Sequence, residues 1–109
     1  MKEDITYELI ARYLKAMADE SRLKILHALR GRTMSVSEIV SQTGLTQSNV
    51  SRHLRVLKQL GLVRAVKKER NIFYSQTSTL PHKICELICG RITTEAKKEV
   101  KEITKFLTS

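Results

Sequence analysis

Hydrophobic residues recur at helical spacing in the first part of the chain. From Ile5 to Met17 they fall three or four residues apart, which predicts an amphipathic helix that ends near Ala18. Asp19 is a favourable N-cap for a second helix, and Gly31 suits the left-handed position that follows a helix end. The pattern therefore predicts two consecutive helices.

The next segment predicts a short helix and a longer one. Ser35 followed three residues later by Glu38 is a capping-box pattern, and the short helix that it starts ends at Gly44. Thr46 is the N-cap of the longer helix, whose apolar residues keep helical spacing until Gly61. A short helix, a tight turn and a longer helix have the proportions of a helix-turn-helix.

The pattern changes between residues 62 and 77, where strand-forming residues flank the polar run 67–71. This change predicts a hairpin with a basic tip. Pro81 suits the first turn of a last helix with an apolar stripe over residues 84–107, and Gly90 in its middle favours a kink or a restart. We expect one mainly α domain over residues 1–109: a winged helix-turn-helix of about five helices and a two-stranded wing.

Charge indicates the class of partner. The 109 residues include 20 Lys and Arg against 11 Asp and Glu, a formal net charge of +9, and such an excess favours a polyanion. No stretch approaches the roughly 18 apolar residues of a membrane span, and the first residues lack a signal-peptide pattern, so we expect a cytoplasmic protein without a membrane partner. The sequence shows no acid-base pair, no nucleophile with a base and no glycine-rich phosphate loop. We therefore do not expect an enzyme.

The longer helix of the helix-turn-helix carries the candidate base-reading residues. In such motifs this helix lies in the major groove of double-stranded DNA, and the hairpin lies along the backbone or minor groove. The candidates on the helix are Thr46, Gln47, Ser48, Asn49, Ser51, Arg52, His53 and Arg55. Those on the hairpin are Lys67, Lys68, Arg70 and Asn71. The alternative is that these polar side chains are ordinary caps and solvent contacts.

Three motifs between Leu14 and Tyr74 carry a family resemblance. They read LKAMADESRLKILHAL, LTQSNVSRHLRVLKQLGLV and ERNIFYS, and they resemble the ArsR/SmtB family of winged-helix repressors. The resemblance implies a homodimer joined through the first and last helices, and repression by operator binding that an inducer releases. The long apolar stripe of the last helix, too extensive for one small core, agrees with a dimer.

The usual metal-binding motifs of that family are absent. The segment 35–44 contains no cysteine, so the Cys-Val-Cys site of arsenic and cadmium sensors is missing. The positions of the zinc ligands on the last helix are here Ser78, Leu80, Arg91 and Thr94. The resemblance therefore does not identify an inducer.

Cys85 and Cys89, with His82 before them, fall on adjacent turns of one helix face. Two thiols at this spacing suit arsenite or a thiophilic divalent metal, with further ligands from a second subunit. They could equally be redox-active thiols, or small hydrophobic residues of the core. Two other functions stay open: a winged helix that binds DNA without an inducer or cofactor, and one that binds protein or RNA.

Overall fold

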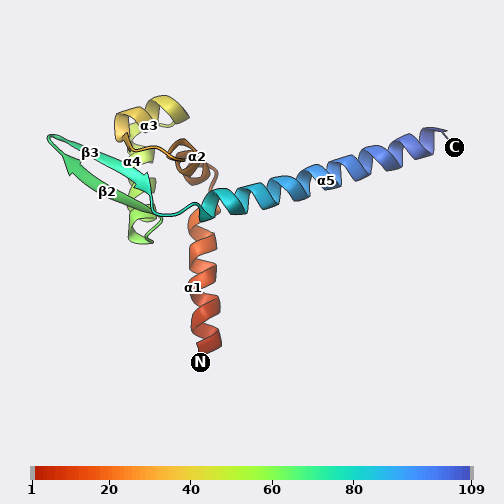
Figure 1. The fold of residues 1–109 in the computed structure, drawn as a ribbon, viewed down its shortest axis with the longest axis horizontal. Helices are drawn as coiled ribbons and strands as arrows, with labels where there is room; N and C mark the ends of the chain where they lie inside the picture. The colour runs from red at the N-terminus through yellow and green to blue at the C-terminus, as the bar shows by residue number, and fades with distance from the viewer. Residues whose placement is uncertain (1, 109) are drawn as a thin grey trace. The chain divides into compact units, whose positions relative to one another are not determined.

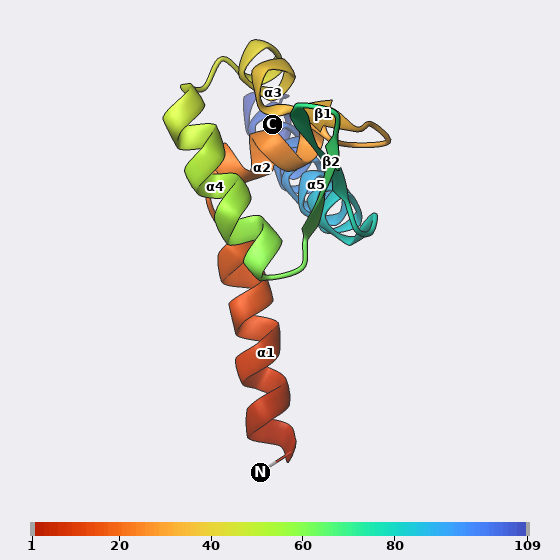
Figure 2. The ribbon, with the colours of Figure 1, turned by 90° about the vertical axis from the view of Figure 1, so that its left-hand side faces the viewer.

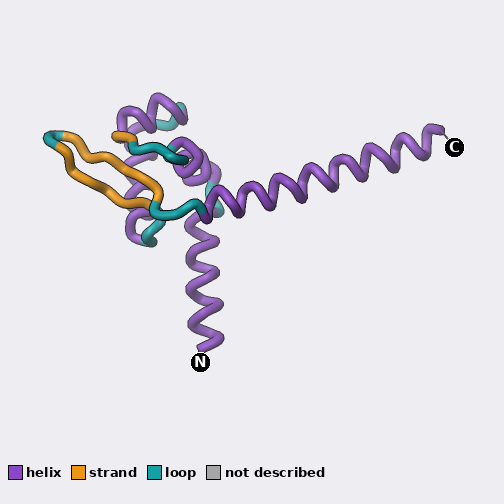
Figure 3. Tube along the Cα trace, viewed as in Figure 1, coloured by secondary structure: helices purple, strands orange, loops and turns teal. Residues whose placement is uncertain are grey.

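A computed structural model describes residues 2–108 of the chain. Two compact parts, Met1–Thr79 and Leu80–Ser109, are described separately below. The elements are, in chain order (Figures 1 and 3), α1 (Lys2–Met17), α2 (Glu20–Ala28), β1 (Met34–Ser35), α3 (Val36–Thr43), α4 (Gln47–Gln59), β2 (Val63–Lys68), β3 (Asn71–Gln76) and α5 (Leu80–Thr108).

The predicted caps of α3 and α4 are confirmed. The Ser35 hydroxyl accepts the Glu38 N–H at 3.3 Å, and the Glu38 carboxylate accepts the Ser35 N–H at 3.1 Å, which completes the capping box. Gly44 ends α3 in the left-handed region with φ 74°. The Thr46 hydroxyl accepts the Asn49 N–H at 3.2 Å and so begins α4. These local interactions set the turn between the two helices.

The second helix is also capped as predicted, but it is shorter. The carboxylate of Asp19 accepts the backbone N–H of Arg22 at 3.0 Å. The helix ends at Ala28, and the chain then turns over residues 29–31, where Gly31 has φ 64°. Gly31 therefore ends the turn after α2 and does not cap the helix directly.

The wing is the hairpin of β2 and β3, and it belongs to a three-stranded antiparallel sheet of order β1-β3-β2. The hairpin register runs from the pair Val63 and Gln76 to the pair Lys68 and Asn71 at the tip. The third strand, β1, contains only two residues and was not predicted. It places the residues before α3 against the middle of β3, with Met34 opposite Tyr74.

The core of the first part lies where α2, α3 and α4 pack together, next to the start of the hairpin (Figure 2). Its fully buried side chains are aliphatic, as expected for a chain of few aromatic residues. They are Ile25, Leu29, Ile39, Val50, Leu54, Leu57 and Leu62. The packing fixes one face of α4 and leaves its opposite face at the surface.

The second part is one continuous helix, α5, which runs through Gly90 without the predicted break. The hydroxyl groups of Thr93 and Thr94 donate to the carbonyls of Cys89 and Gly90 at 2.8 and 2.9 Å. These bonds satisfy both hydroxyls inside the helix. None of the helices within residues 2–108 combines the length and the apolar composition needed to cross a membrane.

Candidate nucleic-acid interface

Helix α4 has one buried face and one exposed polar face. Successive residues of an α-helix are turned by about 100°, so that Val50, Leu54 and Leu57 share one side, and all three are buried. The exposed residues of the opposite side have hydrogen-bonding or cationic side chains. They are Gln47, Ser48, Ser51, Arg52, Arg55, Lys58 and Gln59. These are side-chain types that recognise base edges and phosphates.

The N-terminal turn of α4 orients one of these cations. Asn49 is half-buried, and its side-chain oxygen accepts a hydrogen bond from the Arg52 guanidinium at 3.3 Å. The Thr46 hydroxyl caps the helix and lies 3.4 Å from the Ser48 hydroxyl. Thr46 and Asn49 therefore shape the helix start, whereas the Arg52 side chain is exposed to solvent.

His53 is placed differently from the other predicted contact residues. It lies on the buried face of α4 with Val50 and Leu57 and is only 5% exposed. Its Nε2 atom is 3.9 Å from Oδ1 of Asp19. This burial corrects the prediction that His53 contacts DNA, because a buried ring cannot reach a base edge or a phosphate. The signal was in the spacing, since His53 follows Val50 by three residues and precedes Leu57 by four.

The tip of the wing is a solvent-exposed cationic segment. Lys67, Lys68, Arg70 and Asn71 are all exposed there, and Glu69 between them takes φ 58° at the turn. Among residues 2–108, no acidic side chain forms an ion pair with these three cations. The predicted residues thus form two exposed groups, one on α4 and one at the hairpin tip.

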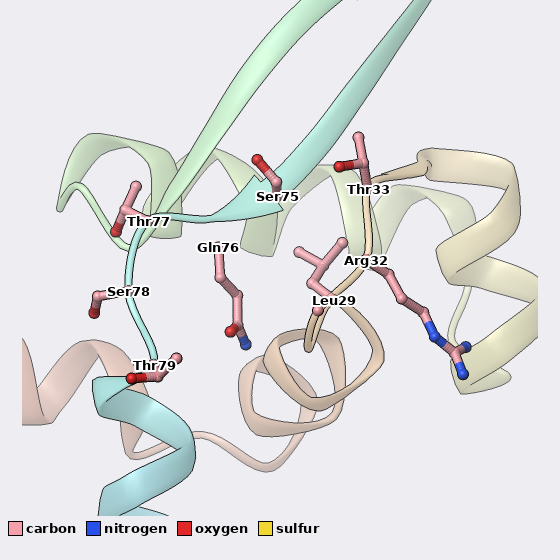
Figure 4. A pocket seen from close by; sticks show the side chains of 9 residues that line it. Leu29, Arg32, Thr33, Ser75, Gln76, Thr77, Ser78 and Thr79 are labelled. Atoms are coloured by element: carbon pink, nitrogen blue, oxygen red, sulfur yellow. The ribbon is translucent and has the colours of Figure 1, made fainter.

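An open pocket of about 380 Å³ lies at the base of the wing (Figure 4). Hydroxyl groups from Thr33, Ser75 and residues 77–79 line it. The Gln76 amide points toward α2, where it donates to a backbone carbonyl, and the Arg32 side chain extends away from the hydroxyls of residues 77–79. The lining is therefore mostly polar and uncharged.

The predicted sensing residues lie on α5. In the single chain Cys89 is an exposed free thiol and Cys85 a half-buried one. His82 Nε2 is 2.9 Å from the Glu86 carboxylate. Within residues 2–108, no three His, Cys, Asp or Glu side chains converge in a way that could hold a metal ion.

Both terminal helices expose large hydrophobic side chains. On α1 these are Ile5, Tyr7, Leu9, Ile10 and Leu14. On α5 they are Leu80, Leu87, Ile88, Ile92, Val100, Ile103, Phe106 and Leu107. Apolar area of this extent is unusual on a monomer surface and is typical of association.

A helix-turn-helix with an exposed polar second helix, followed by a basic hairpin, defines a winged helix-turn-helix protein. Residues 19–65 match the family described as bacterial regulatory protein, arsR family. The transcriptional activator HlyU of Vibrio cholerae is 43% identical over 75 residues, which are 69% of this chain and 69% of HlyU. The chain belongs to the ArsR family and is a transcriptional regulator rather than an enzyme.

Solved structures agree with this assignment. NolR from Sinorhizobium fredii superposes with a TM-score of 0.73 at 33% identity, covering 80% of this chain and 87% of NolR. The homodimeric winged helix-turn-helix DNA-binding domain Mb0332 from Mycobacterium bovis gives a TM-score of 0.74 at 25% identity, covering 89% of this chain and 90% of that domain. The fold prediction is therefore confirmed, with the short strand β1 as an addition.

Proposed function

We propose that this regulator binds operator DNA as a homodimer and that the exposed face of α4 distinguishes the operator from other sequences. The observation that carries the proposal is the exposed position of Arg52 in the N-terminal half of α4, where the Asn49 side-chain oxygen accepts a hydrogen bond from its guanidinium. An arginine presented this way can donate two hydrogen bonds to a guanine in the major groove. Gln47 and Ser51, exposed on the same side, supply further base contacts.

The wing supplies the sequence-independent part of the affinity. Lys67, Lys68 and Arg70 are exposed cations at its tip, and Asn71 adds a hydrogen-bonding side chain. Contacts of this kind with phosphates position the protein and release counterions, whichever bases are present. A protein that acts on chromosomal DNA in this way is expected in the cytoplasm of a bacterial or archaeal cell.

The exposed apolar faces of α1 and α5 support the homodimer. The solved domain Mb0332 is homodimeric, and a symmetric pair would bury the same residues of each subunit. Two copies of α4 would then face two half-sites about one helical turn apart on DNA, at roughly 34–36 Å. The operator is expected to be an inverted repeat.

The DNA proposal is tested by comparing two single variants on two duplexes. One duplex is selected by the wild-type protein from a random pool, and the other has the same composition in scrambled order. Arg52→Ala should weaken binding to the selected duplex by about 1–3 kcal/mol and relax the preferred sequence. Lys68→Ala should weaken binding to both duplexes and reduce the dependence of affinity on salt.

Lys24→Ala is the matched control, because it removes an exposed cation of α2, outside α4 and the wing. Equal losses from Arg52→Ala and Lys68→Ala on both duplexes would contradict the assigned roles. Selection of a single-stranded RNA in place of a duplex, or of no nucleic acid at all, would favour the alternative in which the winged helix binds RNA or protein.

For the inducer, we propose the thiol pair Cys85 and Cys89, which could bind arsenite or a thiophilic divalent metal, or respond to an oxidant. Both thiols lie on one face of α5, and the further ligands would come from His82, once released from Glu86, or from the second subunit. Thiolate ligation would release the operator and end repression.

The sensing proposal is tested by titrating the reduced protein on its selected duplex with arsenite, zinc, cadmium and hydrogen peroxide. The variant Cys85→Ser, Cys89→Ser removes both thiols at nearly constant volume. Release of the wild type but not of this variant by one agent would identify the thiols as the sensor. If all four agents leave the wild-type complex intact, the regulator works without these inducers.

A further inference from the structure

Helix α4 contacts the corner between α1 and α2 through a pair of side chains, His53 and Asp19. The imidazole of His53, 5% exposed, faces the carboxylate of Asp19 with 3.9 Å between Nε2 and Oδ1. This separation is longer than a hydrogen bond, so the carboxylate acts on the ring through its charge, and the two form an ion pair only when the ring is protonated. The two residues are far apart in the sequence, and the contact therefore joins two separate elements of the fold.

Asp19 is the residue that shapes that corner. Its backbone N–H donates to the Met17 carbonyl at 2.8 Å, where α1 ends. Its carboxylate oxygen accepts the N–H of Arg22 at 3.0 Å, where α2 begins. The same oxygen faces His53, so the carboxylate links the start of α2 to the middle of α4, while the backbone N–H of the same residue binds the end of α1.

The surroundings of His53 favour its neutral form. Burial lowers the pKa of the ring below its ordinary value, the Asp19 carboxylate opposes this shift, and the cationic side chains of Arg52 and Arg22 add to it. The Nδ1 atom is buried without a hydrogen-bond partner among the described residues.

We infer that His53 is a positioning residue for DNA recognition: its contact with Asp19 sets how α4 lies against α2, and thereby where Arg52 and the rest of the exposed face meet the bases. His53 lies on the buried face of α4 and those side chains lie on its exposed face, so His53 acts on their position through the placement of the helix. The inference deepens the proposed function and rests on it. Direct base contacts need their donors placed within a few tenths of an ångström, so a small movement of α4 is enough to reduce specificity.

Two pairs of variants distinguish the effect of the contact between Asp19 and His53 from the effect of side-chain packing. Asp19→Asn keeps an oxygen that can cap α2, because asparagine is as good an N-cap as aspartate, but it removes the charge that faces His53. Asp19→Ala removes both. His53→Leu removes the ring nitrogens and keeps an apolar side chain, whereas His53→Gln restores an N–H donor near the position of Nε2.

The measurement is the ratio of affinities for the selected and scrambled duplexes, made on the full-length chain at equal salt. His53→Leu and Asp19→Asn should each lower the ratio about tenfold, with affinity for the scrambled duplex nearly unchanged. The double variant should be no worse than either single variant. His53→Gln should recover most of the ratio, which packing alone would not predict.

A ratio that stays within about twofold of the wild type in Asp19→Asn, with the protein folded, would overturn the inference. So would independent losses that multiply in the double variant. If His53→Leu does not fold, Asp19→Asn and His53→Gln still decide the question, since both retain polar groups at the contact. A wild-type protein that shows no preference for any duplex would instead contradict the proposed function.

Discussion

Helices α4 and α5 are both amphipathic, yet only α4 has its apolar face covered within the described chain. Leu54 and Leu57 of α4 are buried in the core, whereas on α5 Ile88 is 53% exposed and Ile92 is 63% exposed. A hydrophobic stripe is stabilising only when it is removed from water. The comparison indicates that α4 needs only its own chain to be placed, whereas α5 needs a partner surface.

The largest effect is expected from placing charged residues in the apolar stripe of α5, which should weaken the dimer. Replacing Ile92 and Ile103 with lysine should weaken the dimer at least about a hundredfold, since burial of each isoleucine contributes about 1.5–3 kcal/mol. Sedimentation equilibrium of the double variant measures the dissociation constant. Lys97→Glu is the control, because it reverses a charge on the other side of the same helix and should leave the dimer intact. Unchanged association of the double variant would place the interface elsewhere.

Truncating a side chain of the core should lower the stability of the folded chain. Leu57→Ala removes a fully buried side chain and should lower the free energy of unfolding by about 2–5 kcal/mol. Leu107→Ala removes the same atoms from an exposed position on the apolar stripe of α5. Its effect should depend on protein concentration, because association through the stripe would bury Leu107. Denaturant melts at two concentrations measure both, and equal losses that do not vary with concentration would contradict the distinction.

A smaller effect is expected where a cap fixes the helix before α4. Ser35→Ala removes the side-chain half of the capping box of α3 and should lower the free energy of unfolding by about 1 kcal/mol. Ser41→Ala, the same substitution at an exposed position inside α3, should be neutral or slightly stabilising. Thermal melts of the two variants make this comparison. A loss at Ser41 equal to that at Ser35 would show that the cap is not the cause.

The smallest effect is on the pH dependence of stability. Burial lowers the pKa of His53 in the folded chain, so the unfolded chain takes up its proton at higher pH. The free energy of unfolding should therefore fall as the pH drops below about 6.5, the ordinary value for histidine. His53→Gln should flatten this slope. Denaturant melts between pH 5 and 8, a range set around that ordinary value, test the difference.

Local signals in the sequence predicted much of the fold. Caps such as Ser35 with Glu38, and Gly44 at the end of α3, depend on residues a few positions apart, so the pattern alone identifies them. The strand β1 escaped prediction because two residues are too short for a periodic pattern, and its pairing with β3 spans about forty positions. Gly90 was expected to interrupt α5, but the helix continues through it.

The candidate interface was predicted less completely than the fold. Polar residue types at the start of α4 indicated the exposed face correctly, as with Gln47 and Arg52. His53 was assigned to the same surface because residue type was weighed above helical position. Its partner Asp19 lies in another element, and a contact between residues so far apart in sequence depends on the packing of α2 against α4. Periodicity could have placed His53 on the buried face, but it could not have named Asp19.

The central claim is that the exposed face of α4 recognises bases while the wing contacts the backbone. Titration of the isotope-labelled protein with the selected and scrambled duplexes, followed by NMR, tests it directly. The account predicts that the signals of Gln47, Ser51 and the Arg52 guanidinium change on the selected duplex only, and that those of Lys68 and Arg70 change on both. Unchanged α4 signals on the selected duplex, with the largest changes on another element, would contradict it.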